Sequence, residues 1–231
     1  MRFMISLATI LVFSGLACGQ TPKEPLRRGE LKPMESALTG HTPEYYLKLR
    51  QLLFGRAPVR SDLHFLILPS FEPETLASVY KIGDGFEVQI AESEKDVWFH
   101  MGRVEEIGVK VSRKTLPAAL AIRLKSLWTL MLLRTRYERS DVTVNDGVFY
   151  VFSATETGIG QMTGVTHSPA EGTRPCVLAD IGKLLIAFVV AEPSREREVL
   201  SKMNELMDLL DAMLATASAS ESTKGTESRK K

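Results

Sequence analysis

Two hairpin patterns constrain the fold of this chain more than any other feature. The first is a pair of β-prone runs, 75–82 and 86–90, on either side of Gly83-Asp84-Gly85. Glycines in a three-residue turn supply the positive φ angles that a hairpin needs. The second pattern joins runs 148–153 and 161–165 through a Gly-containing turn at 157–160. Both patterns predict an antiparallel sheet.

Helical periodicity surrounds these strands. Apolar residues recur at spacings of three and four in four segments: 43–55, 117–138, 177–188 and 194–213. Further strand candidates are 63–68, 97–101 and 107–111. We therefore expect a single domain of the α+β class, with an antiparallel sheet of about five to seven strands covered by helices. An amphipathic C-terminal helix ends it, and its Leu200, Met207 and Leu214 either pack on the sheet or form a strip for a partner.

The N-terminus has the pattern of an export signal. Arg2 precedes an apolar run over residues 3–13, and small residues follow, which indicates a signal peptide over residues 1–19. The segment Gly15-Leu16-Ala17-Cys18 resembles the lipobox of bacterial lipoproteins, which implies that the Cys18 thiol is lipidated. In that family a leucine usually stands where this chain has Gly15. The alternative is an ordinary cut after Gly19, which removes Cys18.

Composition divides the rest of the chain. Residues 20–41 are rich in proline, glycine and charge and are expected to form a flexible tether. Residues 42–216 form the domain, and the polar tail 217–231 is expected to be disordered. A formal net charge of +1 argues against a nucleic-acid partner. This small net charge results from two oppositely charged stretches that cancel. Residues 61–100 carry eight acids against two bases, and residues 101–140 carry nine bases against three acids.

Motifs for catalysis, metal binding or cofactor binding are weak. The histidines lack the i, i+3 or i, i+4 spacing of a helical metal site, and we expect no metal and no cofactor; they are His41, His64, His100 and His167. The glycines at 158–164 lack a following helix that could bind a phosphate. Cys176 with His167 is a conceivable thiol and base pair, but Cys176 opens an apolar helix and is interpreted as a small core residue.

The segment from Asp146 to Ser153 is the best remaining candidate for a site. It enters a strand that carries Tyr150 and is followed by His167 and Ser168. The face of Tyr150 either belongs to the core or forms the floor of a binding cleft with Asp146, His167 and Ser168 at its rim. Residues 105–190, with Trp128 on a helix and the Asp-Gly-x-x-Tyr-x-Phe strand, resemble a group of uncharacterised bacterial exported proteins and lipoproteins. The resemblance implies no activity.

These patterns together predict an exported protein of the bacterial cell envelope. It is expected in the periplasm or at the outer membrane, held to the membrane by a lipid if Cys18 is modified, and otherwise soluble in the periplasm or secreted. We expect it to act by noncovalent binding or scaffolding, with an envelope protein as partner. The alternative function is a hydrolase or transferase that uses the Tyr150 strand with His167 as base.

Overall fold

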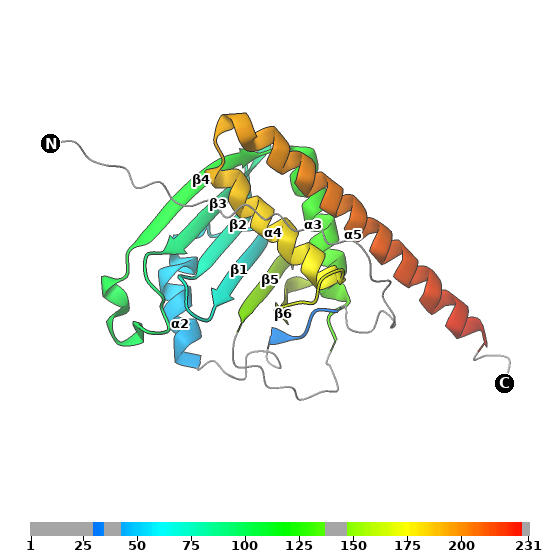
Figure 1. Ribbon diagram of the computed structural model, residues 1–231, viewed down its shortest axis with the longest axis horizontal. Coiled ribbons are helices and arrows are strands. Elements are labelled where there is room, and N and C mark those ends of the chain that lie inside the picture. Colours follow the sequence, from blue (N-terminus) through cyan, green and yellow to red (C-terminus); the bar gives the residue numbers. More distant parts are fainter. Residues whose placement is uncertain (1–29, 35–42, 137–146, 228–231) are drawn as a thin grey trace.

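A six-stranded antiparallel sheet forms the centre of the molecule (Figure 1). The structure is a computed structural model that describes residues 30–34, 43–136 and 147–227. Its elements in chain order are α2 (Pro43–Leu52), η1 (Phe54–Arg56), β1 (Leu63–Pro69), β2 (Thr75–Ile82), β3 (Gly85–Ser93), η2 (Met101–Glu106), β4 (Val109–Leu116), α3 (Ala118–Leu133), β5 (Val148–Glu156), β6 (Gly160–His167), α4 (Arg174–Val190) and α5 (Pro193–Glu227). The predicted α+β class, its antiparallel sheet and its C-terminal helix are confirmed.

The strand order is β4-β3-β2-β1-β5-β6, so the first strand lies inside the sheet. The β2–β3 and β5–β6 hairpins form as their turn sequences predict. Helix α3 returns the chain from the β4 edge to β5, which pairs with the free side of β1. Residue 63 thereby faces a partner on each side, Val79 of β2 and Ala154 of β5.

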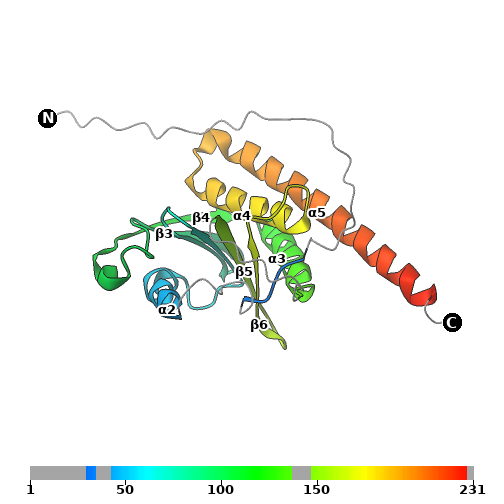
Figure 2. The same ribbon diagram turned by 60° about the horizontal axis from the view of Figure 1, so that its bottom comes forward.

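Helices cover both faces of the sheet. Figure 2 shows α3, α4 and α5 on one face, called here the helical face, and α2 on the other. The core of the helical face contains an aromatic cluster in which the rings of Phe65 and Trp128 each lie 5.2 Å from the ring of Phe152. Tyr45 of α2 and Leu66 of β1 belong to a second, smaller core on the opposite face.

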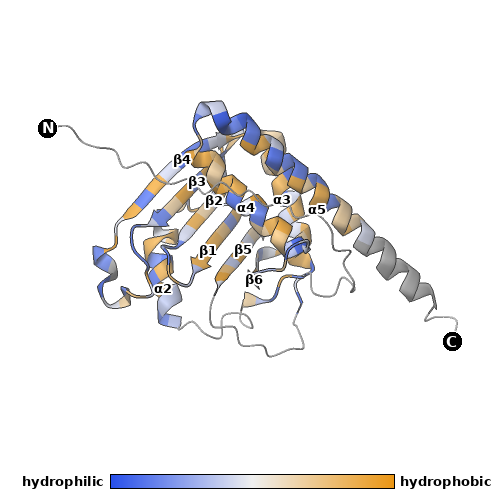
Figure 3. Cartoon of the chain, viewed as in Figure 1, coloured by the Kyte–Doolittle hydropathy of each residue, from blue (hydrophilic) through white to orange (hydrophobic). Residues whose placement is uncertain are grey.

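Helix α4 lies very close to the sheet, and α5 packs on α4. A Cβ atom at Gly182 of α4 would lie 2.5 Å from the ring of Phe65. Met207 and Leu214 of α5 are buried and Leu200 packs against the core, so the proposed partner strip on this helix is covered by the domain itself. Figure 3 shows the apolar residues gathered on the strands and α4, while the first turns of α5 are hydrophilic.

One predicted strand is wrong. Residues 97–100 form a turn rather than a strand, and Met101 begins η2. The buried carboxylate of Glu74 accepts the backbone N–H of Val97 at 2.9 Å, and the carboxylate of Asp96 accepts the N–H of Phe99 at 3.1 Å. Both donors are bound by side chains, which favours a turn over pairing with a neighbouring strand.

The ends of the domain also differ from the expected boundaries. Residues 30–34 fall in the expected tether, yet Leu31 is buried in the core and Lys32 pairs with Val165 of β6. Helix α5 continues to Glu227, into the tail expected to be disordered. Extension of an existing helix through alanine-containing sequence requires no new nucleus, which explains the added turns.

Candidate functional site

The structure separates the two principal residues of the expected cleft. Tyr150 lies on the helical face, where it is 9% exposed and stacks on Phe65 with ring centroids 5.9 Å apart. His167 pairs across β5 and β6 with Phe149, and their ring centroids are 4.3 Å apart. Neighbouring residues in a strand point to opposite faces, so Tyr150 and His167 lie on opposite sides of the sheet. Asp146 and Cys18 lie outside the described residues.

Ser168 shapes the backbone at the end of β6. Its hydroxyl accepts the backbone N–H of Val148 at 3.1 Å, and its backbone N–H donates to the Val148 carbonyl at 2.9 Å. Gly147 has a φ of 134°, and a Cβ atom there would lie 2.3 Å from the Ser168 hydroxyl. The Asp-Gly pattern that marks this strand therefore reflects the close approach of two strand ends.

Cys176 is half-buried in the first turn of α4. Thr173 caps this helix by accepting the Cys176 backbone N–H, and the Cys176 thiol lies 3.9 Å from the Asp180 carboxylate. Burial, and then the negative charge of Asp180, raise the pKa of the thiol. A nucleophilic cysteine needs a lowered pKa, so these surroundings favour a structural thiol.

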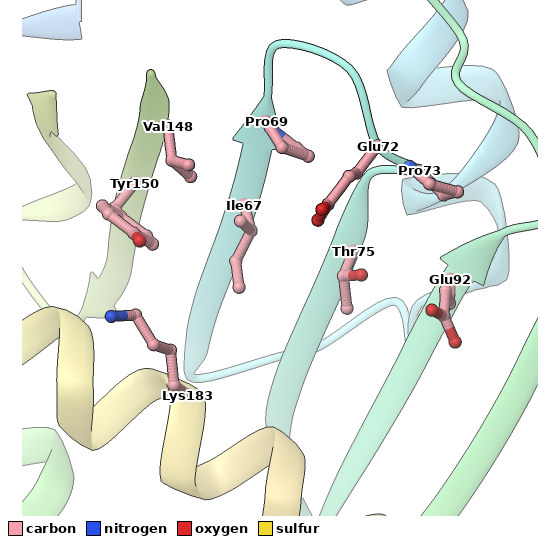
Figure 4. Close-up of a pocket in the computed structure, with 9 residues that line it drawn as sticks. All are labelled: Ile67, Pro69, Glu72, Pro73, Thr75, Glu92, Val148, Tyr150 and Lys183. Atoms are coloured by element: carbon pink, nitrogen blue, oxygen red, sulfur yellow. The ribbon is translucent and has the colours of Figure 1, made fainter. Parts of the chain in front are cut away.

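A different candidate site lies beside Tyr150. A groove of about 310 Å³ opens on the helical face and is lined by Ile67, Pro69, Glu72, Pro73, Thr75, Glu92, Val148, Tyr150 and Lys183 (Figure 4). Its floor follows one cross-strand row: Tyr150 is opposite Ile67, Ile67 is opposite Thr75, and Thr75 is opposite Glu92. Directly opposed residues share a face, so four strands contribute adjacent side chains to this floor.

The path of α4 leaves the groove open. The Lys114 ammonium on β4 donates to the carbonyls of Phe188 and Ala191, which holds the end of α4 over the β4 side of the sheet. Lys114 lies four residues along β4 from Lys110, which pairs with Glu92, so α4 is held at a distance from the Glu92 end of the groove. Helix α3 packs on β5 and β6. The helical face therefore stays uncovered at one end of β1, β2 and β3, where Ile67, Thr75 and Glu92 lie.

The groove has a cationic end and an acidic end. Lys183 reaches from α4 toward Tyr150, and its ammonium lies 5.2 Å from the centre of the ring and 2.8 Å from the Asp180 carboxylate. Burial lowers the pKa of Lys183, but Asp180 and Tyr150 outweigh it and the net pKa is raised. Lys183 therefore acts as a fixed cation. Glu72 and Glu92 are exposed acids at the other end.

A second hollow lies at the opposite end of the strands, and charged residues that line it form ion pairs with one another. It measures about 360 Å³ and includes Asp62, Lys125 and Glu156. The Lys125 ammonium lies 2.9 Å from Asp62 and 3.8 Å from Glu156. Lys183 of the Tyr150 groove is likewise paired, with Asp180, but that groove also presents the exposed acids Glu72 and Glu92 to a ligand. The contact between Asp62 and Lys125 also joins the acidic and basic stretches of the sequence.

Sequence reasoning found Tyr150 but missed Lys183, Glu72 and Glu92 as its neighbours in a site. They come from a helix, a loop and a strand, and no spacing along the chain links them. Within the described residues, no group of three or more His, Cys, Asp or Glu side chains could hold a metal ion. Across the same part of the chain, no helix combines the length and apolar character needed to cross a membrane.

Known proteins give this site no precedent: no family model, curated protein or solved structure matches the chain.

Proposed function

We propose that this chain is an exported bacterial envelope protein, lipid-anchored through Cys18, that acts by noncovalent binding in the groove beside Tyr150. The observation that carries the binding site is the uncovered cross-strand row on the helical face, with a charged Lys183 at one end. The signal-like N-terminus and the lipobox resemblance support export and anchoring. The resemblance of residues 105–190 to uncharacterised bacterial exported proteins supports the same location.

The chemistry of the groove favours binding over catalysis. Lys183 stays charged, which suits recognition of an anion or a carbonyl and does not suit a nucleophilic amine. The alternative enzyme needs Tyr150 and His167 in one site, whereas the two side chains lie on opposite faces. The groove is the better candidate because its side chains already converge.

The shape of the groove indicates an elongated ligand. Four strands spaced about 4.8 Å apart give a floor roughly 14 Å long. Ile67, Pro69 and Val148 offer apolar contacts, while Glu72 and Glu92 offer carboxylates to a positively charged group. A peptide segment with an apolar side chain and a basic side chain matches this arrangement.

Anchoring is tested by replacing the lipidated residue. Cys18→Ala should move the protein from the membrane fraction to the soluble fraction, and mass spectrometry of the unchanged protein should find a lipidated Cys18 at its N-terminus. Unchanged fractionation of the variant, or a mature N-terminus at Gln20, contradicts the lipid anchor.

Binding is tested with a photo-crosslinking residue placed at Thr75, on the groove floor, and at Ser201, an exposed position on α5. In cells, Thr75 should give a discrete adduct that Ser201 does not give. The adduct should disappear when Glu72 and Glu92 are both changed to Lys, because the acidic end of the groove is then reversed. An adduct of equal yield from both positions contradicts a role for the groove.

A further inference from the structure

The outer edge of β6 carries a short docked segment from the N-terminal part of the chain. The backbone N–H of Lys32 donates to the Val165 carbonyl, and the N–H of Val165 donates to the Lys32 carbonyl, each at 2.8 Å. This is an isolated antiparallel bridge, so the segment is bound to the sheet as a very short added strand. It lies away from the groove, at the sheet edge opposite β4.

Leu31 anchors the segment by occupying the space over Gly164 of β6, which has no side chain; this space is called here the slot. The leucine side chain is 0% exposed and belongs to the core of the helical face. A Cβ atom on Gly164 of β6 would lie 3.0 Å from both Cβ and Cδ1 of Leu31, so a side chain at residue 164 would crowd the leucine. The backbone N–H of Arg136 donates to the Leu31 carbonyl at 2.9 Å and fixes the chain at the slot.

An acidic residue beside this leucine meets a buried arginine. The Glu30 carboxylate lies 2.7 Å from Nη2 of Arg174, and the Arg174 side chain is 3% exposed. Arg174 is the first residue of α4, where the helix dipole also favours a negative charge. Arg174 and the slot thus hold an acid followed by a leucine.

Among the described residues, three polar atoms at this site have no hydrogen-bond partner. These atoms, Glu30 Oε2, Arg174 Nη1 and Thr135 Oγ1, are all buried. A carboxylate can engage both terminal nitrogens of an arginine, whereas the Glu30 carboxylate contacts one terminal nitrogen of Arg174. Pro33 follows Lys32 and has no backbone N–H, so the segment cannot continue a regular ladder along β6.

We infer that the outer edge of β6, Gly164 and Arg174 form a binding site for an extended peptide segment in which an acidic residue precedes a leucine, and that residues 30–34 occupy it as an exchangeable intramolecular ligand. A partner segment without a proline would pair along more of β6, which is the strand-addition mode of peptide recognition. Because residues 30–34 belong to the same chain, a partner segment must compete with an intramolecular ligand. The site therefore opens to a partner when residues 30–34 are released.

A vacated site should bind the segment supplied in trans. In the intact chain, Leu31→Asp puts a charge where the buried leucine stands and should release the segment. A fluorescent peptide with the sequence of residues 27–35 should then bind this variant at least tenfold more tightly than the unchanged chain, by fluorescence anisotropy. The same peptide with its leucine replaced by aspartate is the matched control and should not bind.

Adding Gly164→Val to the Leu31→Asp chain should abolish peptide binding, because the new side chain fills the slot. Peptide binding that survives this change, or a folded Leu31→Asp variant that binds no peptide, overturns the inference. Circular dichroism and urea unfolding show whether each variant is folded.

Hydrogen exchange of the unchanged chain gives a second test that needs no variant. If the segment detaches on its own, the Val165 amide should exchange at least tenfold faster than the Phe65 amide of the central strand β1. Equal rates for the two amides would make residues 30–34 an integral strand and would overturn the inference.

Discussion

Glu74 and His64, on the α2 face of the sheet, have pKa values that shift in opposite directions. Burial raises the pKa of Glu74, although hydrogen bonds from Tyr45 and Val97 partly counteract it. Burial lowers the pKa of His64 to about 4. Because the pKa of Glu74 is raised in the fold, folding becomes less favourable as the pH rises past the ordinary pKa of a glutamate side chain. A lowered histidine pKa makes folding less favourable as pH falls from about 6.5 toward 4.

The neutral form of His64 is bound in the fold, where Nδ1 lies 2.9 Å from the Ser78 hydroxyl and the ring contacts Phe54. Between pH 7 and pH 5 the histidine is protonated in the unfolded chain but stays neutral in the fold, which should lower the unfolding free energy by about 2 kcal/mol. The variant His64→Phe keeps the ring contact and should lack this loss. Urea unfolding at the two pH values measures it, and the difference between the two proteins removes the opposing contribution of Glu74. Identical pH dependence in both would contradict the assignment.

Phe152 tests the packing of the aromatic cluster. Its side chain is 0% exposed between Phe65 and Trp128. Phe152→Ala should lower the free energy of unfolding by about 3 to 5 kcal/mol, because it leaves a cavity in the core. Phe71→Ala is a matched control, since Phe71 is 72% exposed and its loss should change stability by less than about 1 kcal/mol. Similar losses of unfolding free energy for both variants would mean that Phe152 is not packed tightly in the aromatic cluster.

At the scale of the elements, local pattern predicted those helices and strands whose own sequence determines them. Residues 75–82 form β2 with the predicted ends, because a β-prone run meets a glycine turn there. The failure at 97–101 has a distant cause, since the Val97 N–H is bound by Glu74, which stands just before β2. Likewise, Leu31 looked like part of a tether because its slot is provided by Gly164, far along the chain.

Helix α5 should tolerate a charge on one side and not on the other. Met207 is 0% exposed where α5 packs on the domain, whereas Leu209 is 48% exposed. Met207→Asp buries an unpaired charge and should lower the unfolding free energy by several kcal/mol or prevent folding, while Leu209→Asp should cost less than about 1 kcal/mol. Urea unfolding of both variants checks this difference. A stable Met207→Asp protein would mean that α5 detaches from α4 at little cost.

Gly182 should resist replacement despite its place in a helix. Alanine normally favours a helix over glycine by about 1 kcal/mol. At residue 182 the added methyl group would lie 2.5 Å from the Phe65 ring, so α4 must move away from the sheet. Gly182→Ala should therefore lower the unfolding free energy by about 1 to 3 kcal/mol. An increase in stability in urea unfolding would show that α4 is not held against β1.

At the scale of the whole molecule, the groove could not be predicted from sequence. Its floor depends on the register of four strands, and its opening depends on the direction in which α4 crosses them. Tyr150 was identified because its strand has a strong pattern. Lys183 is one of the polar residues of an amphipathic helix pattern, and nothing in that pattern links it to Tyr150. Only the fold brings the two side chains together.

Under the proposed lipid anchor, the docked position of residues 30–34 would limit how far the domain can move from the membrane. In a chain anchored at Cys18, only 12 residue steps separate the lipid-bearing residue from Glu30. Fully extended, they span about 40 Å. If Cys18 carries the proposed lipid, the domain would be confined to a thin layer next to the bilayer, with the β6 edge where the connecting segment joins the domain. Release of residues 30–34 would lengthen the segment between the lipid and the domain, so the groove could reach partners farther from the membrane.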